Sequence, residues 1–550
     1  MSSQSNETFH KYPDDFLDKE TLKNAGILDI KTPKINSSIK ISSLEFDSRK
    51  VKEDTLYFAL PGLHVDGHDF IQDAIKKGAR IIVHQNDLSS IDEGVIYLKV
   101  KNSRFAMSPI SASFYGHPSR EMIIIGVTGT EGKSTTVYLI YQLLKLLGKK
   151  TGFISTVQRD EGKGELWNQE HQTTPEAPII QQLLREMKNN EVEIAVIESS
   201  SHGLSKKTNR LGDVDFDIGV MTNVNHDHLE FHGSWEQYQS DKAELFRSLK
   251  NFGVVNRDDN SSSFFTSATK QLTYSFSTRS LEADLTIKLI HSGKLGNWYD
   301  VLCPSGKTIT IRDKLPGSFN AGNVLASILV TSNLYNIEIE KIVKLIPYLK
   351  PVRGRMSSIS KGQDFEVLVD YAHTPSSFET VLYPLRERLE ERGGKLICVF
   401  GSAGERDTEK RPIQGAIAAQ YSDIIILCDE DPRGEEPMSI LEDIAKGCEA
   451  SQGFEKTQVA EANLGITPNA EKDSKTPSRF KRGKNLFLIP DRPSAIRKAF
   501  SLAEKNDLVL LLGKGHENSI IQAKETLSYD EIQEAEKALE ELGYSLKTTE

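Results

Sequence analysis

A glycine-rich turn that follows a short apolar run constrains the fold of this chain more than any other feature. The apolar run is Met122–Ile125, and the turn reads Gly126-Val-Thr-Gly-Thr-Glu-Gly-Lys-Ser-Thr-Thr136. Apolar residues then recur at helical spacing, at Val137, Ile140, Leu144 and Leu147. A buried strand that turns through glycines into a helix presents backbone N–H groups to an anion at the helix N-terminus. The pattern predicts a phosphate-binding loop in an α/β domain.

The spacing within this turn departs from the strict phosphate-loop motif, because Gly126 stands one residue too far from the Gly-Lys pair. The usable core is Gly129-x-x-Gly132-Lys133-Ser134. In such a loop the lysine reaches the β- and γ-phosphates of a nucleoside triphosphate, and the serine hydroxyl contacts Mg²⁺. We therefore predict a nucleoside-triphosphate site. The alternative is an ordinary glycine turn between a strand and a helix.

Length and charge limit the classes of protein to which the chain can belong. Its 550 residues are enough for about three domains. A net charge of −10 argues against binding nucleic acid by neutralising its phosphates. No apolar run approaches the length of a membrane span, and the N-terminus does not resemble a signal peptide. The four cysteines have no metal-ligand spacing, so we expect reduced thiols in a cytoplasmic protein.

Strand-like runs and breaks in the pattern predict three domains, covering residues 1–118, 119–348 and 349–550. The first is a small α/β domain with candidate strands at 39–46, 55–60, 79–84 and 94–100. The other two alternate buried apolar runs with helical segments, which is typical of parallel, doubly wound sheets. Their candidate strands are 122–127, 192–197, 216–221, 367–369, 395–400, 424–427 and 508–512. A polar stretch near 451–484 predicts an inserted loop.

In the central region, polar residues follow each predicted strand. They are Thr128–Ser134, Glu198–His202 and Thr222–His228. Parallel strands bring such loops to one edge of the sheet, where ligands bind. Glu198 could hold Mg²⁺ together with Ser134, or it could cap the next helix. The three histidines between Asn223 and His232 could form a zinc cluster, which the phosphate-loop context disfavours.

The third region follows the same rule. Its candidate strands end in Asp370–Pro375, Gly401–Asp407, Asp429–Arg433 and Gly513–Glu517. These polar ends predict a second site at the carboxyl edge of a second α/β sheet.

In their order along the chain, these motifs resemble those of the Mur ligases. The matching segments are Gly126–Thr136, Glu198–Leu204, Asn223–His232, Leu315–Asn320 with Asn323, Arg353–Arg355, Asp370–Pro375 and Gly513–Glu517. The resemblance spans nearly the whole chain. Val369–Pro375 and Gly513–Glu517 resemble the branch that adds the third residue of the peptidoglycan stem peptide. The resemblance to the Mur ligases implies a small N-terminal α/β domain for a UDP-substrate, a central doubly wound ATPase domain and a C-terminal Rossmann-like domain.

The resemblance also implies an activity. Such an enzyme is an ATP-dependent amide ligase that forms ADP and phosphate during peptidoglycan synthesis. It activates the carboxylate of UDP-N-acetylmuramoyl-L-alanyl-D-glutamate as an acyl phosphate, which the amine of a free diamino acid attacks. We expect a monomer that needs ATP and Mg²⁺ and binds neither nucleic acid nor a membrane.

Site residues follow from the same resemblance. Catalysis is assigned to Lys133, Glu198, His228 and Lys242, and metal binding to Ser134, Glu198, His228 and Lys242. The implied ATP contacts are Gly129, Thr130, Glu131, Gly132, Lys133, Ser134, Thr135, Asn320, Arg355 and Asp370. The implied contacts of the UDP-substrate are Ser48, Thr173, Thr174, Ser200 and Arg210. Lys242 is expected to be carbamylated, which turns a cation into an anionic metal ligand; by itself it reads as a solvated helix lysine.

The implied pocket for the incoming amino acid consists of Arg406, Glu430, Asp431, Pro432, Arg433, Gly513 and Glu517. Arg433 favours meso-diaminopimelate, because a guanidinium binds a distal carboxylate bidentately. Asp431 stands where the diaminopimelate branch has asparagine, and an added acid could instead favour the ammonium of L-lysine or L-ornithine. Glu131 is a second departure, since the family usually has asparagine there and a carboxylate near phosphates is unfavourable.

Three other readings stay open at this point. A folylpolyglutamate or cyanophycin ligase shares the central motifs, but it does not predict Asp47-Ser48-Arg49 or Val369–Pro375. A nucleotide-dependent switch or motor has no use for the polar residues of the third region. A catalytically silent homologue is suggested by Glu131, although Lys133, Glu198, His228 and Lys242 are all present.

Overall fold

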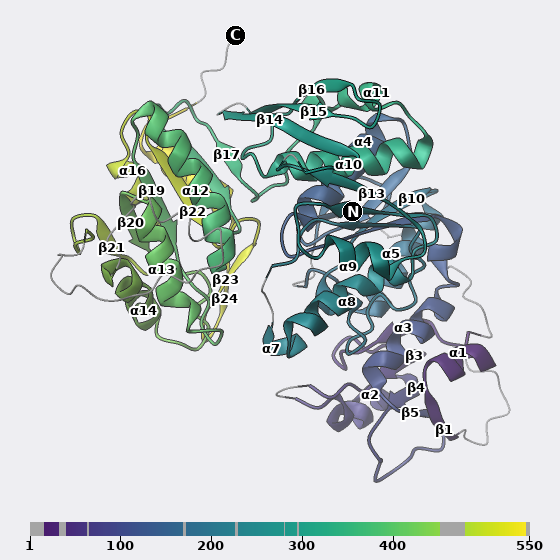
Figure 1. Ribbon diagram of the computed structural model, residues 1–550. Coiled ribbons are helices and arrows are strands. Elements are labelled where there is room, and N and C mark those ends of the chain that lie inside the picture. Colours follow the sequence, from purple (N-terminus) through teal and green to yellow (C-terminus); the bar gives the residue numbers. More distant parts are fainter. Residues whose placement is uncertain are drawn as a thin grey trace, which may run out of the picture. The chain divides into compact units, whose positions relative to one another are not determined.

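The computed structural model describes residues 16–31, 40–62, 65–168, 172–225, 229–279, 281–293, 296–450 and 479–545 (Figure 1). The chain forms two compact units. The first comprises Met1–Ile287, Leu302–Lys307 and Gly322–Leu345, and the second comprises Lys288–Val301, Thr308–Ala321 and Ile346–Glu550. Both are built from α/β layers, as predicted. Within the described ranges, no helix is long and apolar enough to cross a bilayer.

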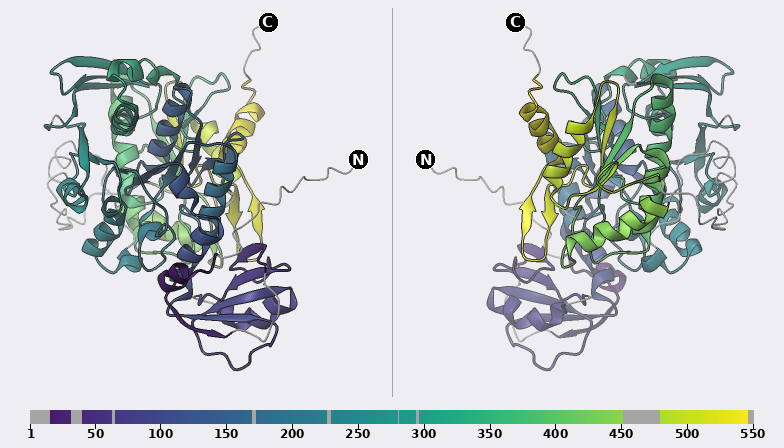
Figure 2. Two further views of the ribbon diagram at one scale, coloured as in Figure 1. Left: turned by 90° about the vertical axis from the view of Figure 1, so that its right-hand side faces the viewer. Right: turned by 90° about the vertical axis from the view of Figure 1, so that its left-hand side faces the viewer.

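The N-terminal part of the first unit is a 5-stranded sheet of order β1-β5-β4-β3-β2, drawn in purple in Figure 2. Its strands are β1 (Ile27–Lys31), β2 (Ser43–Glu45), β3 (Thr55–Phe58), β4 (Ala79–His84) and β5 (Ile96–Val100). Only β1 runs antiparallel to its neighbour. Its helices are α1 (Lys19–Asn24), α2 (Ile71–Lys76) and α3 (Ser103–Phe114). Alternate residues of β4 enter two separate apolar clusters, which explains its continuous apolar run.

The central sheet of the first unit has the order β13-β12-β11-β6-β10-β7-β8-β9. The strands from β13 to β7 are parallel. The bounds are β6 (Ile123–Thr128), β7 (Thr151–Ile154), β8 (Gln158–Asp160), β9 (Leu166–Trp167), β10 (Ile194–Glu198), β11 (Ile218–Met221), β12 (Phe252–Asn256) and β13 (Leu272–Ser277). Because β6 lies between β11 and β10, the loops that follow all three strands share one edge.

Helix α4 follows the glycine-rich loop and buries Val137, Ile140 and Leu144 of its predicted apolar face. The described helices of this part of the chain are α4 (Lys133–Leu146), α5 (Ala177–Asn189), α6 (Ser201–Leu204), α7 (Leu229–His232), α8 (Trp235–Arg247), α9 (Ser262–Ala268), α10 (Asn320–Tyr335) and α11 (Ile339–Val343). Helices α5 and α8 share one apolar cluster with the strands, and α4 packs against β6, β7 and β10. Strand β14 (Leu285–Gly293) pairs with β13 through its first residues.

The second unit contains a 6-stranded sheet of order β17-β18-β22-β19-β20-β21. Its strands are β17 (Ser357–Ile359), β18 (Glu366–Asp370), β19 (Leu396–Phe400), β20 (Ile424–Leu427), β21 (Leu486–Leu488) and β22 (Leu508–Leu512). Helices α12 (Pro375–Arg392), α13 (Lys410–Tyr421) and α14 (Pro437–Ala450) pack on one face. Helices α16 (Arg492–Leu502) and α17 (Glu531–Glu541) pack on the other, so the sheet is doubly wound, as predicted.

The second unit also holds two smaller strand groups. Strands β15 (Gly296–Leu302) and β16 (Thr308–Arg312) follow β14 in the sheet order β14-β15-β16. Strand β23 (Ser519–Ile521) pairs with β24 (Thr526–Ser528), and both are shown in yellow in Figure 2. The predicted insertion near 451–484 falls mostly outside the described residues, which resume at Arg479.

The predicted strand bounds agree best where a strand is buried on both faces. The runs 79–84, 424–427 and 508–512 are strands β4, β20 and β22 without change. The run 192–197 begins too early, because the Val192 N–H donates to the Met187 carbonyl (3.0 Å) and closes the end of α5. Apolar character therefore located the strands, while helix-end hydrogen bonds set some of their limits.

Gly126 in β6 gives a test of this packing. An added Cβ would lie 2.6 Å from Leu245 Cδ1 and 2.8 Å from Phe216 Cε1. Overpacking of this kind costs about 1–3 kcal/mol, so we expect Gly126→Ala to lower the free energy of unfolding by that amount in urea titrations. Gly94→Ala is the control, since its Cβ would meet nothing within 4 Å. Equal stability of both variants would contradict the packing described here.

Candidate active site

The glycine-rich loop runs from the end of β6 to the start of α4 at the carboxyl edge of the central sheet. Gly129 has φ +152°, and a Cβ there would lie 1.9 Å from Thr222 Oγ1. Gly132 has φ +79°, and its Cβ would lie 2.6 Å from Asn323 Oδ1. Both positions therefore need glycine. The backbone turns tightly at the N-terminus of α4, which is the arrangement that binds phosphates.

Lys133, Ser134 and Glu198 are brought together at this edge. The Ser134 hydroxyl donates to Glu198, with both carboxylate oxygens at 2.9 Å, and the Thr156 N–H donates to Glu198 Oε2 (2.8 Å). Lys133 Nζ donates to the Thr130 carbonyl (2.7 Å) within the loop. A hydroxyl and a buried carboxylate beside a phosphate loop are hard oxygen donors, which suit Mg²⁺. The residues present therefore fit a nucleotide and its metal ion.

Lys242 belongs to the same edge, although it comes from α8. Its side chain is buried, with 1% of the residue exposed, and Nζ donates to the Gly129 carbonyl (2.5 Å). Nζ also lies 4.5 Å from the centre of the Tyr238 ring, whose hydroxyl is 2.9 Å from Thr130 Oγ1. The interpretation of Lys242 as a solvated helix lysine is therefore wrong. His228, the other implied metal ligand, lies outside the described residues.

Glu131 and Thr135 complete the loop. The Glu131 backbone is held on both sides, because its N–H donates to Asn223 Oδ1 (2.9 Å) and its carbonyl accepts from Thr222 Oγ1 (2.6 Å). Thr135 lies half-buried in the first turn of α4. The two hydrogen bonds with Asn223 and Thr222 hold the backbone of the loop at Glu131.

Three of the residues implied for the UDP-substrate in the central region, Thr174, Ser200 and Arg210, cluster beside Glu198. The Thr174 hydroxyl donates to the Glu198 carbonyl (2.9 Å), accepts from the Ser200 N–H (3.0 Å) and lies 2.9 Å from Ser200 Oγ. Arg210 donates to the Thr174 carbonyl (2.9 Å) and to Glu176 (3.0 Å). Arg104 of α3 also donates to Glu176 (2.7 Å), which ties the N-terminal sheet to this cluster.

Ser48 and Thr173 are half-buried. Asp47 Oδ1 accepts from the Arg49 N–H (3.0 Å), so the turn that carries Ser48 is closed by Asp47 and not by the serine hydroxyl. A turn closed in this way is an Asx-type turn, one of the two turn types, Asx or serine, that Asp47-Ser48-Arg49 allows without any substrate contact.

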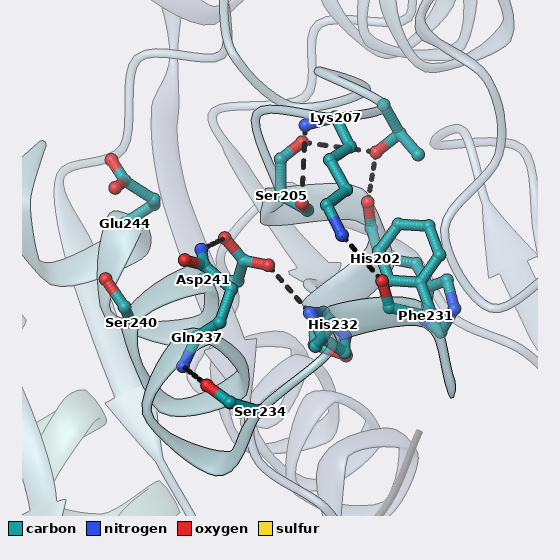
Figure 3. A network of polar contacts seen from close by, with 12 residues as sticks. His202, Ser205, Lys207, Phe231, His232, Ser234, Gln237, Ser240, Asp241 and Glu244 are labelled. Atoms are coloured by element: carbon teal, nitrogen blue, oxygen red, sulfur yellow. Dashed lines mark hydrogen bonds and ion pairs between the residues drawn. The ribbon is translucent and has the colours of Figure 1, made fainter. Parts of the chain in front are cut away.

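A buried hydrogen-bond network includes Asp241, which precedes Lys242 in α8 (Figure 3). His232 Nδ1 is 2.7 Å from Asp241 Oδ2, and His232 Nε2 is 3.1 Å from Ser201 Oγ. Gln237 Nε2 donates to Asp241 Oδ1 (2.8 Å). Burial raises the pKa of Asp241, but hydrogen bonds from His232, Gln237 and Ser205 outweigh this effect and hold the pKa below its ordinary value. The network joins α6, α7 and α8, which carry or flank the implied site residues.

In the second unit, Arg355 and Asp370 form part of one polar cluster. Asp370 is buried and accepts from the N–H groups of Met356 (2.8 Å) and Ala372 (2.8 Å). Burial raises its pKa, opposed by Arg355. The Arg355 guanidinium lies 4.5 Å from the centre of the Tyr371 ring. Met356 has φ +50°, a strained backbone that is common at functional sites. Asn320, also in this unit, donates to the Pro316 carbonyl (2.7 Å).

The loops that follow β20 and β22 bring most of the implied acceptor pocket together. Gly513 has φ +100°, and its Cβ would lie 3.1 Å from Glu430 Oε2, so only glycine leaves this carboxylate undisturbed. Glu430 is buried, which raises its pKa, and Oε2 has no hydrogen-bond partner among the described residues. Pro432 is buried and Arg433 has φ +52°, while Arg406 lies on an exposed loop after β19.

Asp431 is already neutralised within the protein. It accepts from Lys514 Nζ (2.9 Å) and from the Ile521 N–H (2.9 Å). Lys514 is buried and also donates to Glu517 (2.5 Å). Burial raises the pKa of Glu517, opposed by Lys514. The expectation that Asp431 is free to bind an incoming ammonium is therefore wrong.

Two functional features were missed from the sequence. Lys514 stands inside the Gly513–Glu517 motif, so it could have been found as a cation among acids. His232 is one of the three histidines between Asn223 and His232, but nothing in the sequence indicates its distant partners Asp241 and Ser201. Among the ranges that the structure describes, no three His, Cys, Asp or Glu side chains form a group that could hold a metal ion.

Family models match three consecutive parts of the chain. The model of the Mur ligase family catalytic domain matches residues 40–115, the Mur ligase middle domain matches 127–331, and the Mur ligase glutamate ligase domain matches 354–515. The chain belongs to the Mur ligase family. It is thus an ATP-dependent amide ligase of peptidoglycan synthesis. The interpretations as a nucleotide switch or as a folylpolyglutamate or cyanophycin ligase are not supported.

Curated relatives of this Mur ligase cover nearly its whole length. UDP-N-acetylmuramyl-tripeptide synthetase of Treponema denticola is 48% identical over 534 residues, which are 92% of this chain and 94% of the relative. UDP-N-acetylmuramoyl-L-alanyl-D-glutamate–2,6-diaminopimelate ligase of Clostridium tetani is 34% identical over 511 residues, which are 92% and 96% of the two chains.

A solved structure shares the fold. The MurF ligase of Thermotoga maritima in complex with ADP has a TM-score of 0.58 at 19% identity and covers 91% of this chain and 97% of its own. This similarity supports the three-domain Mur ligase architecture that the sequence predicts.

The buried His232 network gives a stability prediction. Removing one partner of a buried pair leaves the other uncompensated, so His232→Ala should lower the free energy of unfolding by about 3 kcal/mol. Because the pKa of Asp241 is lowered in the folded state, its contribution to stability is present at neutral pH and is lost as pH falls through that pKa. Urea titrations at pH 7 measure the loss.

Lys150→Ala is the control for this measurement. Lys150 and Glu191 pair at 2.5 Å with side chains 56% and 77% exposed, so we expect a loss below about 1 kcal/mol. A His232→Ala loss no larger than that of Lys150→Ala would show that the network contributes little to the fold.

Proposed function

We propose that the chain joins meso-diaminopimelate to UDP-N-acetylmuramoyl-L-alanyl-D-glutamate, forming ADP and phosphate. The Clostridium tetani relative carries this activity in its name. The Treponema denticola relative is named for its tripeptide product, and the name does not state the third residue. The observation that carries the choice of acceptor is Arg433, whose Nε is buried without a partner among the described residues.

We also propose domain boundaries near residues 118 and 348, which lie between the segments that the three family models match.

ATP and Mg²⁺ would be held at the carboxyl edge of the central sheet. Gly129, Thr130, Glu131, Gly132 and Thr135 would contribute the phosphate loop. The Ser134 hydroxyl and the Glu198 carboxylate, which meet at 2.9 Å, would contribute metal ligands. In the second unit Asn320, Arg355 and Asp370 are proposed for the rest of the nucleotide. Bound Mg²⁺ would neutralise the phosphate charge that otherwise repels the substrate carboxylate.

Lys133 and Lys242 are proposed to act on that charge in different ways. Lys133 stays cationic and would bind the γ-phosphate. Lys242, already buried against the loop at Gly129, is proposed to become a carbamate that, with Glu198 and His228, holds a second metal ion. A lysine that forms a carbamate replaces its cation with an anionic oxygen ligand.

The substrate would lie beside Glu198 with its peptide end at Thr173, Thr174, Ser200 and Arg210. Ser48 is proposed for the UDP end. Arg210 already contacts the Thr174 carbonyl and Glu176, so its guanidinium is oriented before the substrate binds. Orientation of this kind lowers the entropic cost of bringing two anions into position for acyl transfer.

The proposed acceptor pocket consists of Arg406, Glu430, Asp431, Pro432, Arg433, Gly513 and Glu517. Its preference is inferred from which charges are already paired. Lys514 pairs with Asp431 and Glu517, so neither acid is free to select an ammonium. Arg433 and Glu430 each keep one polar atom without a partner among the described residues. The distal end of meso-diaminopimelate has both a carboxylate and an ammonium. Its carboxylate would accept from the Arg433 Nε–H, and its ammonium would donate to Glu430 Oε2.

L-lysine or L-ornithine is the second candidate acceptor. The buried Glu430 Oε2 favours it, because a carboxylate without a donor can accept from a simple ammonium. That acceptor would leave Arg433 without an anion, which is why we rank it second.

Phosphate release tests the proposal. The purified protein is assayed with ATP, Mg²⁺ and UDP-N-acetylmuramoyl-L-alanyl-D-glutamate, adding meso-diaminopimelate, L-lysine or L-ornithine in turn. We expect release with meso-diaminopimelate, and a loss of roughly 100-fold or more in kcat/KM for Arg433→Met, as for a charge-assisted contact. Turnover with lysine or ornithine instead would reassign the acceptor, and no acceptor-dependent release would reject the proposal.

Lys242 gives a separate test of the metal site. Lys242→Ala should reduce ligation to near background, and short-chain carboxylates such as acetate should partly restore it, because they replace the missing anionic ligand. Lys206→Ala is the control, since this lysine is 76% exposed in its side chain and pairs with Glu244 at the surface. Full activity of Lys242→Ala would remove this lysine from the site.

A further inference from the structure

A fully buried ion pair lies beneath the proposed acceptor pocket in the second unit. Arg492, at the first position of α16, contacts Glu531, at the first position of α17, and both side chains are 0% exposed. Arg492 Nη2 donates to Glu531 Oε1 (2.6 Å) and Nε donates to Oε2 (2.8 Å). The Tyr529 hydroxyl donates to the same carboxylate.

Arg492 also donates to backbone carbonyls of the two loops that carry the proposed acceptor pocket, and Nη1 donates to Cys428 Sγ (3.4 Å) as well. Nη1 donates to the Asp429 carbonyl (3.0 Å), directly before Glu430. Nη2 donates to the Leu512 carbonyl (2.7 Å), directly before Gly513. One guanidinium therefore holds Asp429, in the loop that carries Arg433, and Leu512, the last residue of the strand that leads to Glu517.

These two loops have no direct strand pairing between them. The sheet order places β19 between β22 and β20, so no ladder hydrogen bond joins the strands from which the loops emerge. Arg492 joins the two loops through their backbone carbonyls, whereas Lys514 joins them through the Asp431 side chain. A rigid, planar fork that donates in several directions suits such a bridge, whereas a lysine ammonium cannot reproduce its geometry.

A buried ion pair is poor evidence for stability alone. Replacing such a pair by apolar residues is often neutral or stabilising, because two charges lose their hydration. Its placement at the base of two polar loops points instead to control of loop position. A displacement of about 1 Å in such a site can change a rate by as much as 100-fold.

We infer that Arg492 is a positioning residue that fixes the distance between the Glu430–Arg433 and Gly513–Glu517 loops and so sets the affinity for the acceptor amino acid. This inference rests on the proposed function, since it takes these loops as the acceptor pocket. Glu531 holds the guanidinium in place, and Tyr529 holds Glu531. None of the three is proposed to touch a substrate.

Arg492→Lys tests the inference because it keeps the charge that Glu531 needs. We expect the KM for the acceptor to rise about tenfold or more, while the KM values for ATP and the UDP-dipeptide change less than about twofold. Hydrogen–deuterium exchange of residues 429–433 and 513–517, measured without substrates, should become faster. Should Arg492→Lys not fold, Tyr529→Phe should give a smaller change of the same selective kind.

Arg497→Lys is the matched control. Arg497 lies in the same helix and joins the same two helices through Glu534 (2.6 Å) and Glu541 (2.6 Å), but it binds neither functional loop. We expect no KM to change more than about twofold. An acceptor KM that rises equally in both variants, or a uniform fall in kcat alone, would overturn the inference. A wild-type enzyme without acceptor-dependent phosphate release would reject the proposed function itself.

Discussion

The first unit depends on the parallel pairing of β6 with β10. This pairing sets Val127 opposite Glu198, so the glycine-rich loop and the Glu198 carboxylate leave the sheet side by side. Ser134, in the first turn of α4, donates to the Glu198 carboxylate. Thr156 and Thr174 also donate hydrogen bonds to Glu198. On the other side of β6, the residues after β11 hold the Glu131 backbone. Because β6 is central, its loop is held from both flanks, as preorganised charge stabilisation requires.

The second unit uses buried charge for a similar purpose. Arg492, Lys514 and Arg411 are almost completely buried, and each pairs with one or two carboxylates. Ion pairs of this kind add little net stability, because desolvation offsets much of the attraction. Arg492 also donates to the Asp429 and Leu512 carbonyls, and Arg411 donates to the Ala403 carbonyl. Lys514 instead joins the side chains of Asp431 and Glu517. Buried cations thus hold loop residues in places where no strand pairing does.

The sequence predicted the fold well and the site less completely. Strands such as β20 and β22 were predictable because residues buried on both faces leave a continuous apolar run. Asp431 was misread because its partner Lys514 lies 83 positions away, and a charge pattern does not reveal distant pairs. Arg492 gave no signal, since an arginine after an aspartate N-cap looks like an ordinary helix start. Motifs identify loops, whereas the contacts that hold loops in place are long-range.

The acceptor choice is where this difference matters most. Counting charges along Glu430–Arg433 suggests an acidic pocket that would attract the simple ammonium of lysine. In the structure, Lys514 forms ion pairs with both Asp431 and Glu517, so the charges of these two acids are already compensated. What remains is the Glu430 carboxylate and the Arg433 guanidinium, each with a polar atom that lacks a partner among the described residues. Leaving a buried donor without an acceptor costs more free energy than a typical hydrogen bond contributes, so the acceptor that we propose is one that brings an anion to Arg433.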